Sequence, residues 1–178
     1  MNFKEYRINI ELQCKANNAC KEEYDKLISS ETEEDFWKVL NGNGQWCGSN
    51  KIEIPVEKLN LITSNSWKFY YCKYIKDVKE LWTTITDDAW KYHYCKDVKD
   101  RKELWCTITD DLYKYFYCRD VKDRKELWST ITNDYYKYLY CSNVKDRKEV
   151  WSTITDDGLK FYYCKYIKDR IELRVKRE

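Results

Sequence analysis

The sequence predicts an all-α protein, a right-handed-type αα solenoid of five 23-residue helix pairs preceded by an N-terminal helical capping module. Three observations predict it: a fixed 23-residue period, helical spacing of the constant positions inside each unit, and recurring helix-capping residues. The chain of 178 residues has only four glycines and one proline. An all-β chain with many turns would need more of both.

The period is seen in columns of identical residues spaced 23 apart. The clearest columns are Cys72, Cys95, Cys118, Cys141 and Cys164, then Trp82, Trp105, Trp128 and Trp151, and Ile85, Ile108, Ile131 and Ile154. A period between about 20 and 50 residues is typical of stacked units that bury their apolar faces against one another. We therefore expect two domains, an N-terminal module at residues 1–53 and a repeat array at residues 54–178.

Within a unit, the constant positions favour helices over strands. In the first half of the unit around Cys118 they are Lys114, Tyr117, Cys118 and Val121, and in the second half Arg124, Leu127, Trp128 and Ile131. Both sets have the i, i+3, i+4, i+7 spacing of one helical stripe, whereas a strand would keep every second residue. The expected helices cover about residues 111–121 and 124–131, with equivalents 23 residues apart.

Capping residues support both helices. Asp123 and Glu126, like the Asp100–Glu103 pair, have the spacing of a capping box that would begin the second helix. The first helix follows a T-D-D stretch, where threonine or aspartate can serve as N-cap. The repeated lysines 68, 91, 114, 137 and 160 lie on the constant stripe. They either cover apolar surface with their stems or pair with aspartates of the next unit.

A strand alternative remains, because tyrosine, threonine, tryptophan and isoleucine all favour strands. If the T-I-T stretch were a strand, Thr107 and Thr109 would share one face. Their equivalents would then stack into a flat threonine array, as in ice-binding β-solenoids.

The N-terminal module has its own helical signals. Residues 19–27 have apolar side chains at helical spacing, and Thr32 can cap a second helix that contains Phe36, Trp37 and Leu40. The N-G-N-G stretch at residues 41–44 would end that helix, with glycine in a left-handed cap. At the other end of the chain Arg174 replaces the repeated tryptophan, as expected for a polar terminal cap.

The unit D-D-L-Y-K-Y-F-Y-C-R-D-V-K-D-R resembles the short tandem helical repeats of bacterial and phage-encoded proteins, D-P-x-x-A-Y-x-Y-A-x-x-V-x-x-x-R. The resemblance covers about residues 64–170, and residues 19–47 resemble a small helical module that accompanies such repeats. This chain departs from the pattern with lysine for alanine, cysteine for another small residue and aspartate for proline. The resemblance implies a helical fold and a phage or mobile-element source, and it implies no activity.

The composition indicates the cellular location of the protein and the kinds of partner it can attract. The nine cysteines are odd in number, and the charged first twelve residues are not a signal peptide, so we expect free thiols and a cytoplasmic location, in a bacterial host if the protein is phage-encoded. No apolar run is long enough to span a membrane. The net charge of +2 gives no general attraction to nucleic acid.

No motif indicates a reaction, a metal site or a cofactor, so we expect no enzymatic activity. His93, the only histidine, occupies a column that holds other ring or apolar residues, and the adjacent Asp110 and Asp111 are explained by helix capping. That varied column is the candidate contact row for a protein: Tyr70, His93, Phe116, Leu139 and Tyr162. On a helix it lies nearly opposite the constant stripe, and therefore either faces outward or packs against the neighbouring layer.

The leading functional hypothesis is a non-enzymatic protein-binding scaffold. By analogy with phage repeats, the partner would be a host protein such as a component of a defence system. The alternative is nucleic-acid binding, since tyrosines and lysines interleave. Against it, residues 100–122 have five basic and five acidic side chains, and a phosphate-binding groove should not average to zero.

Overall fold

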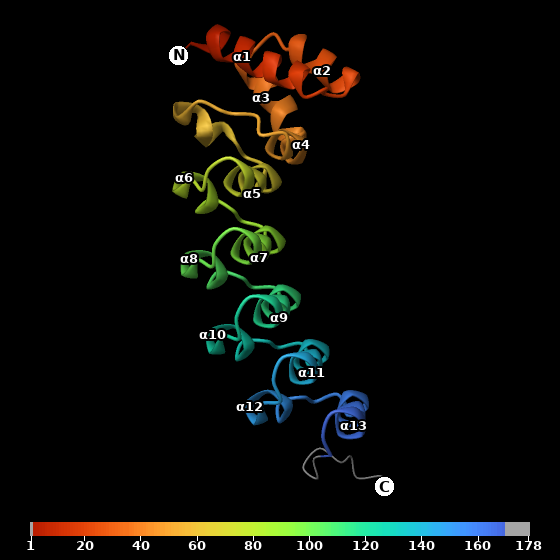
Figure 1. Cartoon of the computed structure of the whole chain (residues 1–178). Coiled ribbons are helices and arrows are strands. Elements are labelled where there is room, and N and C mark those ends of the chain that lie inside the picture. The colour runs from red at the N-terminus through yellow and green to blue at the C-terminus, as the bar shows by residue number, and fades with distance from the viewer. Residues whose placement is uncertain (1, 170–178) are drawn as a thin grey trace. The chain divides into compact units, whose positions relative to one another are not determined.

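A computed structural model describes residues 2–169, which form helices and no strand (Figure 1). The all-α prediction is confirmed. The first elements are α1 (Phe3–Ala16), α2 (Lys21–Ile28), α3 (Glu33–Gly42), α4 (Gly44–Ser49) and the 3₁₀ helix η1 (Val56–Leu61). The repeats follow as α5 (Asn65–Tyr74), α6 (Lys79–Trp82), α7 (Asp88–Asp97), α8 (Lys102–Trp105), α9 (Asp111–Asp120), α10 (Lys125–Trp128), α11 (Asp134–Asn143), α12 (Lys148–Trp151) and α13 (Asp157–Tyr166).

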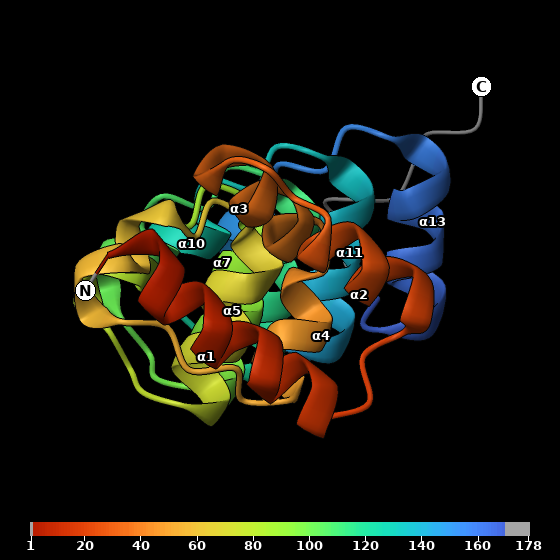
Figure 2. The same cartoon turned by 90° about the horizontal axis from the view of Figure 1, so that it is seen from above.

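The chain forms two compact units, Met1–Val98 and Lys99–Glu178. In the first unit, α1, α2 and α3 pack in sequence and α4 packs on α5 (Figures 1 and 2). In the second unit, α9 contacts α11 and α11 contacts α13, with a short helix following each of the first two. The expected boundary between residues 53 and 54 lies in the segment that joins α4 to η1.

Each complete repeat consists of a ten-residue helix and a four-residue helix. The long helix at Asp111–Asp120 agrees with the predicted 111–121, but the short helix at Lys125–Trp128 ends before the predicted residue 131. The chain turns after it, with the amide of Thr130 bonded to the carbonyl of Leu127. Each T-I-T segment therefore runs from a turn into an irregular loop and forms no strand in the described repeats.

Capping of the long helices agrees with the sequence. Asp87, Asp110, Asn133 and Asp156 each accept a hydrogen bond from a backbone N–H in the first turn. The predicted capping boxes of the short helices are wrong. Arg101, Arg124 and Arg147 occupy the N-cap positions of α8, α10 and α12 without a side-chain cap bond.

The aspartates of those predicted boxes face the next repeat instead. Asp123 accepts a hydrogen bond from the hydroxyl of Tyr140 at 2.6 Å, and Asp100 accepts one from Tyr117 at 2.5 Å. The tyrosine side chains are fully buried, and a buried hydroxyl requires a hydrogen-bond partner. The aspartates therefore bond to the buried tyrosine hydroxyls rather than to the N–H groups of the short helices, which can bond to water instead.

The repeated tryptophan, tyrosine and cysteine columns form the core between layers. Trp105 and Tyr117 have ring centroids 6.0 Å apart, as have Trp128 and Tyr140. Four of the five repeated cysteines are buried, and the fifth, Cys164 on α13, is half-buried. None of them forms a disulfide bond. The predicted core stripe is therefore confirmed in the described repeats.

The N-terminal module contains two helices that the sequence did not indicate, α1 and α4, and its glycines act differently from the prediction. No glycine in the described chain has a positive φ, so the left-handed glycine cap after α3 is wrong. Gly44 and Gly48 instead lie where α4 meets α5. A Cβ atom added at Gly48 would lie 2.2 Å from the Cβ of Tyr70, and one at Gly44 would lie 2.5 Å from that of Trp67.

None of the helices described at residues 2–169 is long and apolar enough to cross a membrane. Arg174, the predicted polar terminal cap, and the second helix of the fifth unit lie outside the described residues.

Candidate interaction surface

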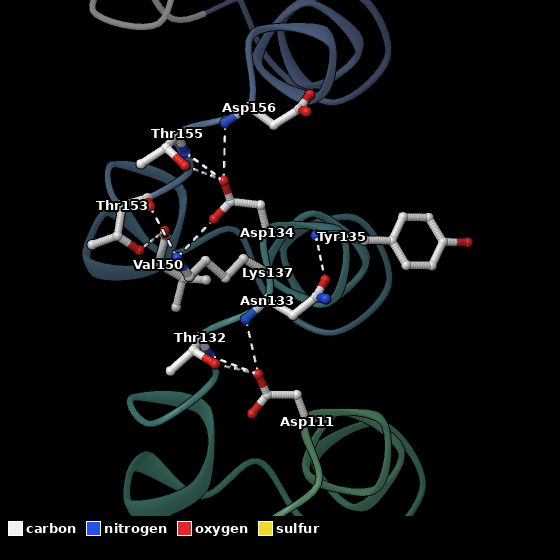
Figure 3. Close-up of polar contacts among 10 residues, drawn as sticks. All are labelled: Asp111, Thr132, Asn133, Asp134, Tyr135, Lys137, Val150, Thr153, Thr155 and Asp156. Carbon is white, nitrogen blue, oxygen red and sulfur yellow. Dashed lines mark hydrogen bonds and ion pairs between the residues drawn. The ribbon is translucent and has the colours of Figure 1, made fainter.

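A polar ladder links the N-termini of successive long helices in the second unit (Figure 3). One carboxylate oxygen of Asp134 accepts hydrogen bonds from the amide and hydroxyl of Thr155, at 2.7 and 2.6 Å, and from the amide of Asp156, at 2.9 Å. Asp111 makes the same contacts with Thr132 and Asn133 one repeat earlier. The first residue of the long helix in these two repeats, Asp111 or Asp134, therefore fixes the N-terminus of the next long helix.

The repeated lysines complete this ladder. Lys137 is 9% exposed, and its Nζ lies 2.8 Å from the other carboxylate oxygen of Asp134 and 2.9 Å from the carbonyl of Thr153. Lys114 has the same arrangement with Asp111 and Thr130. These lysines pair with an aspartate of their own helix, not of the next unit as one alternative had it. Their positive charges are therefore neutralised by carboxylates of the repeats themselves.

The ladder also controls the ionisation of its aspartates. Burial alone would raise the pKa of Asp134, but hydrogen bonds from Lys137, Thr155 and the amide of Asp156 hold it well below its ordinary value. The pKa of Asp111 is lowered for the same reasons. Both carboxylates are charged at neutral pH with their oxygens occupied, so they offer little to a ligand.

The candidate contact row lies on the opposite side of the long helices from their buried stripe. Four of its members are half-exposed: Tyr70, His93, Phe116 and Leu139. The fifth, Tyr162 on α13, is 49% exposed. The row therefore reaches solvent, while part of each side chain packs against neighbours.

In the first unit that packing involves the adjacent layer. The rings of Tyr70 and Trp90 are 5.9 Å apart, and His93 lies 6.1 Å from Phe69. Burial lowers the pKa of His93 and favours its neutral form. These contacts give Tyr70 and His93 a packing role in addition to their partial exposure.

The second unit has further exposed rings on the side of the row. Two further ring side chains are strongly exposed there, Tyr135 at 53% and Tyr166 at 61%. Figure 3 shows the Tyr135 ring pointing away from the helix and from the polar ladder. Tyr162 and Tyr166 stack at 5.9 Å. We define the aromatic face as Phe116, Tyr135, Leu139, Tyr162 and Tyr166.

Two cationic side chains, Arg119 and Lys165, lie beside this face, and each already contacts a neighbouring ring or carboxylate. The Arg119 guanidinium lies 4.7 Å from the Phe116 ring centroid and 2.5 Å from the Asp120 carboxylate. The Lys165 ammonium lies 4.8 Å from the Tyr166 ring centroid. The aromatic face is therefore apolar with a fringe of largely compensated charge.

Within residues 2–169 no group of three or more histidine, cysteine, aspartate or glutamate side chains could hold a metal ion. The side chains that define the aromatic face expose phenol and hydrocarbon groups.

Comparisons with protein-family models, with curated proteins and with solved structures found no match to this chain.

Proposed function

We propose that this protein is a non-enzymatic scaffold whose aromatic face binds a second protein. The observation that carries the proposal is the exposure of Tyr135, Tyr162 and Tyr166, at 53, 49 and 61%, on consecutive long helices. Tyrosine rings supply a large contact area at low entropic cost and are enriched at protein interfaces. Contiguous exposed apolar residues mark contact surfaces, whereas single ones do not.

The charge pattern favours a protein over a nucleic acid. A nucleic-acid groove needs unpaired cations that follow the phosphates. Here Arg119 is paired with Asp120, and the long-helix lysines of the ladder are paired with their own aspartates. A partner that brings apolar and aromatic side chains would bury the rings without leaving this charge uncompensated.

The class of protein to test first comes from the resemblance to phage-type repeats. If the chain is phage-encoded, its partner is a host protein, and a component of a defence system is one such target. This step is analogy with other repeat proteins and carries no residue-level evidence.

The experiment compares three forms of the full chain as bait in a lysate of the source cell, each with and without nuclease treatment. The first is the wild type, and the second carries Tyr135→Ala, Tyr162→Ala and Tyr166→Ala. The third is a control with Lys125→Ala and Glu126→Ala, two exposed residues of α10.

We expect a protein that is retained by the wild type and the α10 control and is lost with the tyrosine variant. Equal retention by the tyrosine variant would place binding elsewhere on the chain. Retention that disappears on nuclease treatment would replace the protein hypothesis with the nucleic-acid alternative.

A further inference from the structure

The N-terminal module contains a cavity of about 100 Å³, and no residue of the aromatic face lines it. Its walls come from the end of α1, the following loop, and α2, α3 and α4. The side chains that characterise it are three thiols, two rings and a leucine: Cys14, Cys20, Cys47, Tyr24, Trp46 and Leu27. Cys20 is exposed, whereas Cys14 and Cys47 are buried, so the cavity reaches solvent on the side of Cys20.

The wall is mostly apolar, and its charged side chain, Glu23, already accepts hydrogen bonds from other residues. Leu27 and Leu40 are 3% and 2% exposed. The carboxylate of Glu23 accepts hydrogen bonds from the Asn43 amide at 2.8 Å and from Lys26 at 2.6 Å. A buried water needs two to four polar partners, and apolar cavities without them stay dry and accept apolar ligands.

The chemistry of the wall favours an aromatic ligand over an aliphatic one. Sulfur atoms make favourable contacts with ring edges, and tyrosine and tryptophan rings pack against other rings. Burial raises the pKa of Cys14 to about 11 and raises that of Cys47 as well, so both thiols are neutral. A charged ligand would lose its hydration there, and the carboxylate in the wall, Glu23, is already bound to Lys26 and Asn43.

We propose that this cavity is a binding site for a small uncharged aromatic molecule of about six or seven heavy atoms, the size of benzene or phenol. An enclosed apolar cavity of roughly 150 Å³ accommodates benzene. The volume here is about 100 Å³, so the ligand can be no larger than a single six-membered ring, and such a ring fits because the cavity is open to solvent beside Cys20. The site is independent of the protein-binding function proposed above.

The test uses the full chain, phenol as the probe and the alkylation rate of each cysteine, measured by peptide mass spectrometry with iodoacetamide. Phenol at about twice its dissociation constant should slow alkylation of Cys20 about threefold. Cys106, which is exposed in the second unit, is the internal control and should react at an unchanged rate. Benzoate, of similar size but charged, should protect neither thiol.

A matched pair of variants links protection to the cavity. Val39→Phe puts a ring into the cavity from α3 and should abolish protection of Cys20. Leu12→Phe makes a similar change on α1 at a side chain that is 62% exposed and should leave protection intact. If circular dichroism shows that Val39→Phe does not fold, Ala19→Leu fills the same cavity from the loop.

The proposal fails if phenol leaves Cys20 alkylation unchanged up to its solubility limit, or slows Cys20 and Cys106 equally. It also fails if a folded cavity-filling variant is protected as well as the wild type.

Discussion

The hydroxyl of Tyr140 donates a hydrogen bond to the carboxylate of Asp123 in the preceding repeat, over 2.6 Å. Arg147 joins them, donating to the Tyr140 oxygen at 2.7 Å and to Asp123 at 2.5 Å. The matching residues one repeat earlier are Tyr117, Asp100 and Arg124. Each triad connects a fully buried ring to the loop of its neighbour, so it fixes the position of one repeat against the next.

Replacing Tyr140 with phenylalanine tests the value of this triad. The ring and its contact with Trp128 remain, but Asp123 loses a donor while still partly buried. We expect the free energy of unfolding to fall by about 1–3 kcal/mol, the usual cost of leaving a buried polar group without its partner. Urea denaturation followed by circular dichroism measures it. Tyr135→Phe, at an exposed ring, is the control, and equal stability of both variants would contradict the prediction.

Acid should weaken the links between repeats. Burial raises the pKa of Asp123, but hydrogen bonds from Tyr140 and Arg147 outweigh it and lower the pKa overall, as those in the ladder do for Asp134. A carboxyl group whose folded pKa is depressed stabilises the fold above its unfolded pKa, and that stability is lost as pH falls through the folded pKa. Since the unfolded value is about 4, stability should hold at neutral pH and decline below about pH 4.

Thermal melts between pH 7 and pH 2 check this, with Asp134→Asn as the comparison. The amide cannot titrate, so this variant should be less stable than the wild type at pH 7 and should lose less stability on acidification. Parallel pH profiles of the two proteins would show that Asp134 does not contribute.

Local information in the sequence was sufficient for the long helices. The stripe from Lys114 to Val121 repeats because it faces the core, and Asp110 caps the helix through a contact two residues away. Local information misled at Asp100, whose spacing to Glu103 fits a capping box. Its partner is the hydroxyl of Tyr117, 17 residues later, and only the stacking of repeats brings the two together.

The contact row shows a second limit of periodicity. Helical spacing gives the direction of Phe116 but not how closely the neighbouring helix approaches. In the first unit, rings of the adjacent layer lie 5.9 Å from Tyr70 and 6.1 Å from His93. Tyr135 and Tyr166 were not predicted because their columns hold non-aromatic residues in other repeats, such as Leu112 and Asp120. These two rings belong to single repeats, so comparing the repeats column by column does not bring them out.

Thiol reactivity should follow burial along the chain. Cys118 and Cys141 are buried, and burial raises the pKa of Cys118 to about 11, which leaves little thiolate at neutral pH. We expect Cys20 and Cys106 to be alkylated rapidly in the native protein and Cys118 and Cys141 only after denaturation. Peptide mass spectrometry without reductant also tests for disulfides. A bond between Cys118 and Cys141 would contradict the predicted free thiols.

Truncation of Trp128 should be among the most damaging single changes in the second unit. Its side chain is 5% exposed, and the Arg147 guanidinium lies 4.9 Å from its ring centroid. Trp128→Ala removes a buried ring and leaves a cavity, a change that typically costs about 3–5 kcal/mol. The melting temperature should drop by several degrees, whereas Tyr135→Ala should change it little. An unchanged melting temperature for Trp128→Ala would place this side chain outside the core.

Gly48 offers the sharpest test of how the N-terminal module is joined to the first repeat. A methyl group at Gly48 would meet both the Cβ atom of Tyr70, at 2.2 Å, and its backbone carbonyl carbon, at 3.1 Å, so α4 and α5 would have to separate. Overpacking of this kind costs about 1–3 kcal/mol. Gly42→Ala is the matched control, because nothing lies within 4 Å of its added methyl and the substitution should be neutral or slightly stabilising. Urea denaturation of both variants decides the point: if Gly48→Ala is as stable as Gly42→Ala, the close contact between α4 and α5 is not what holds the module in place.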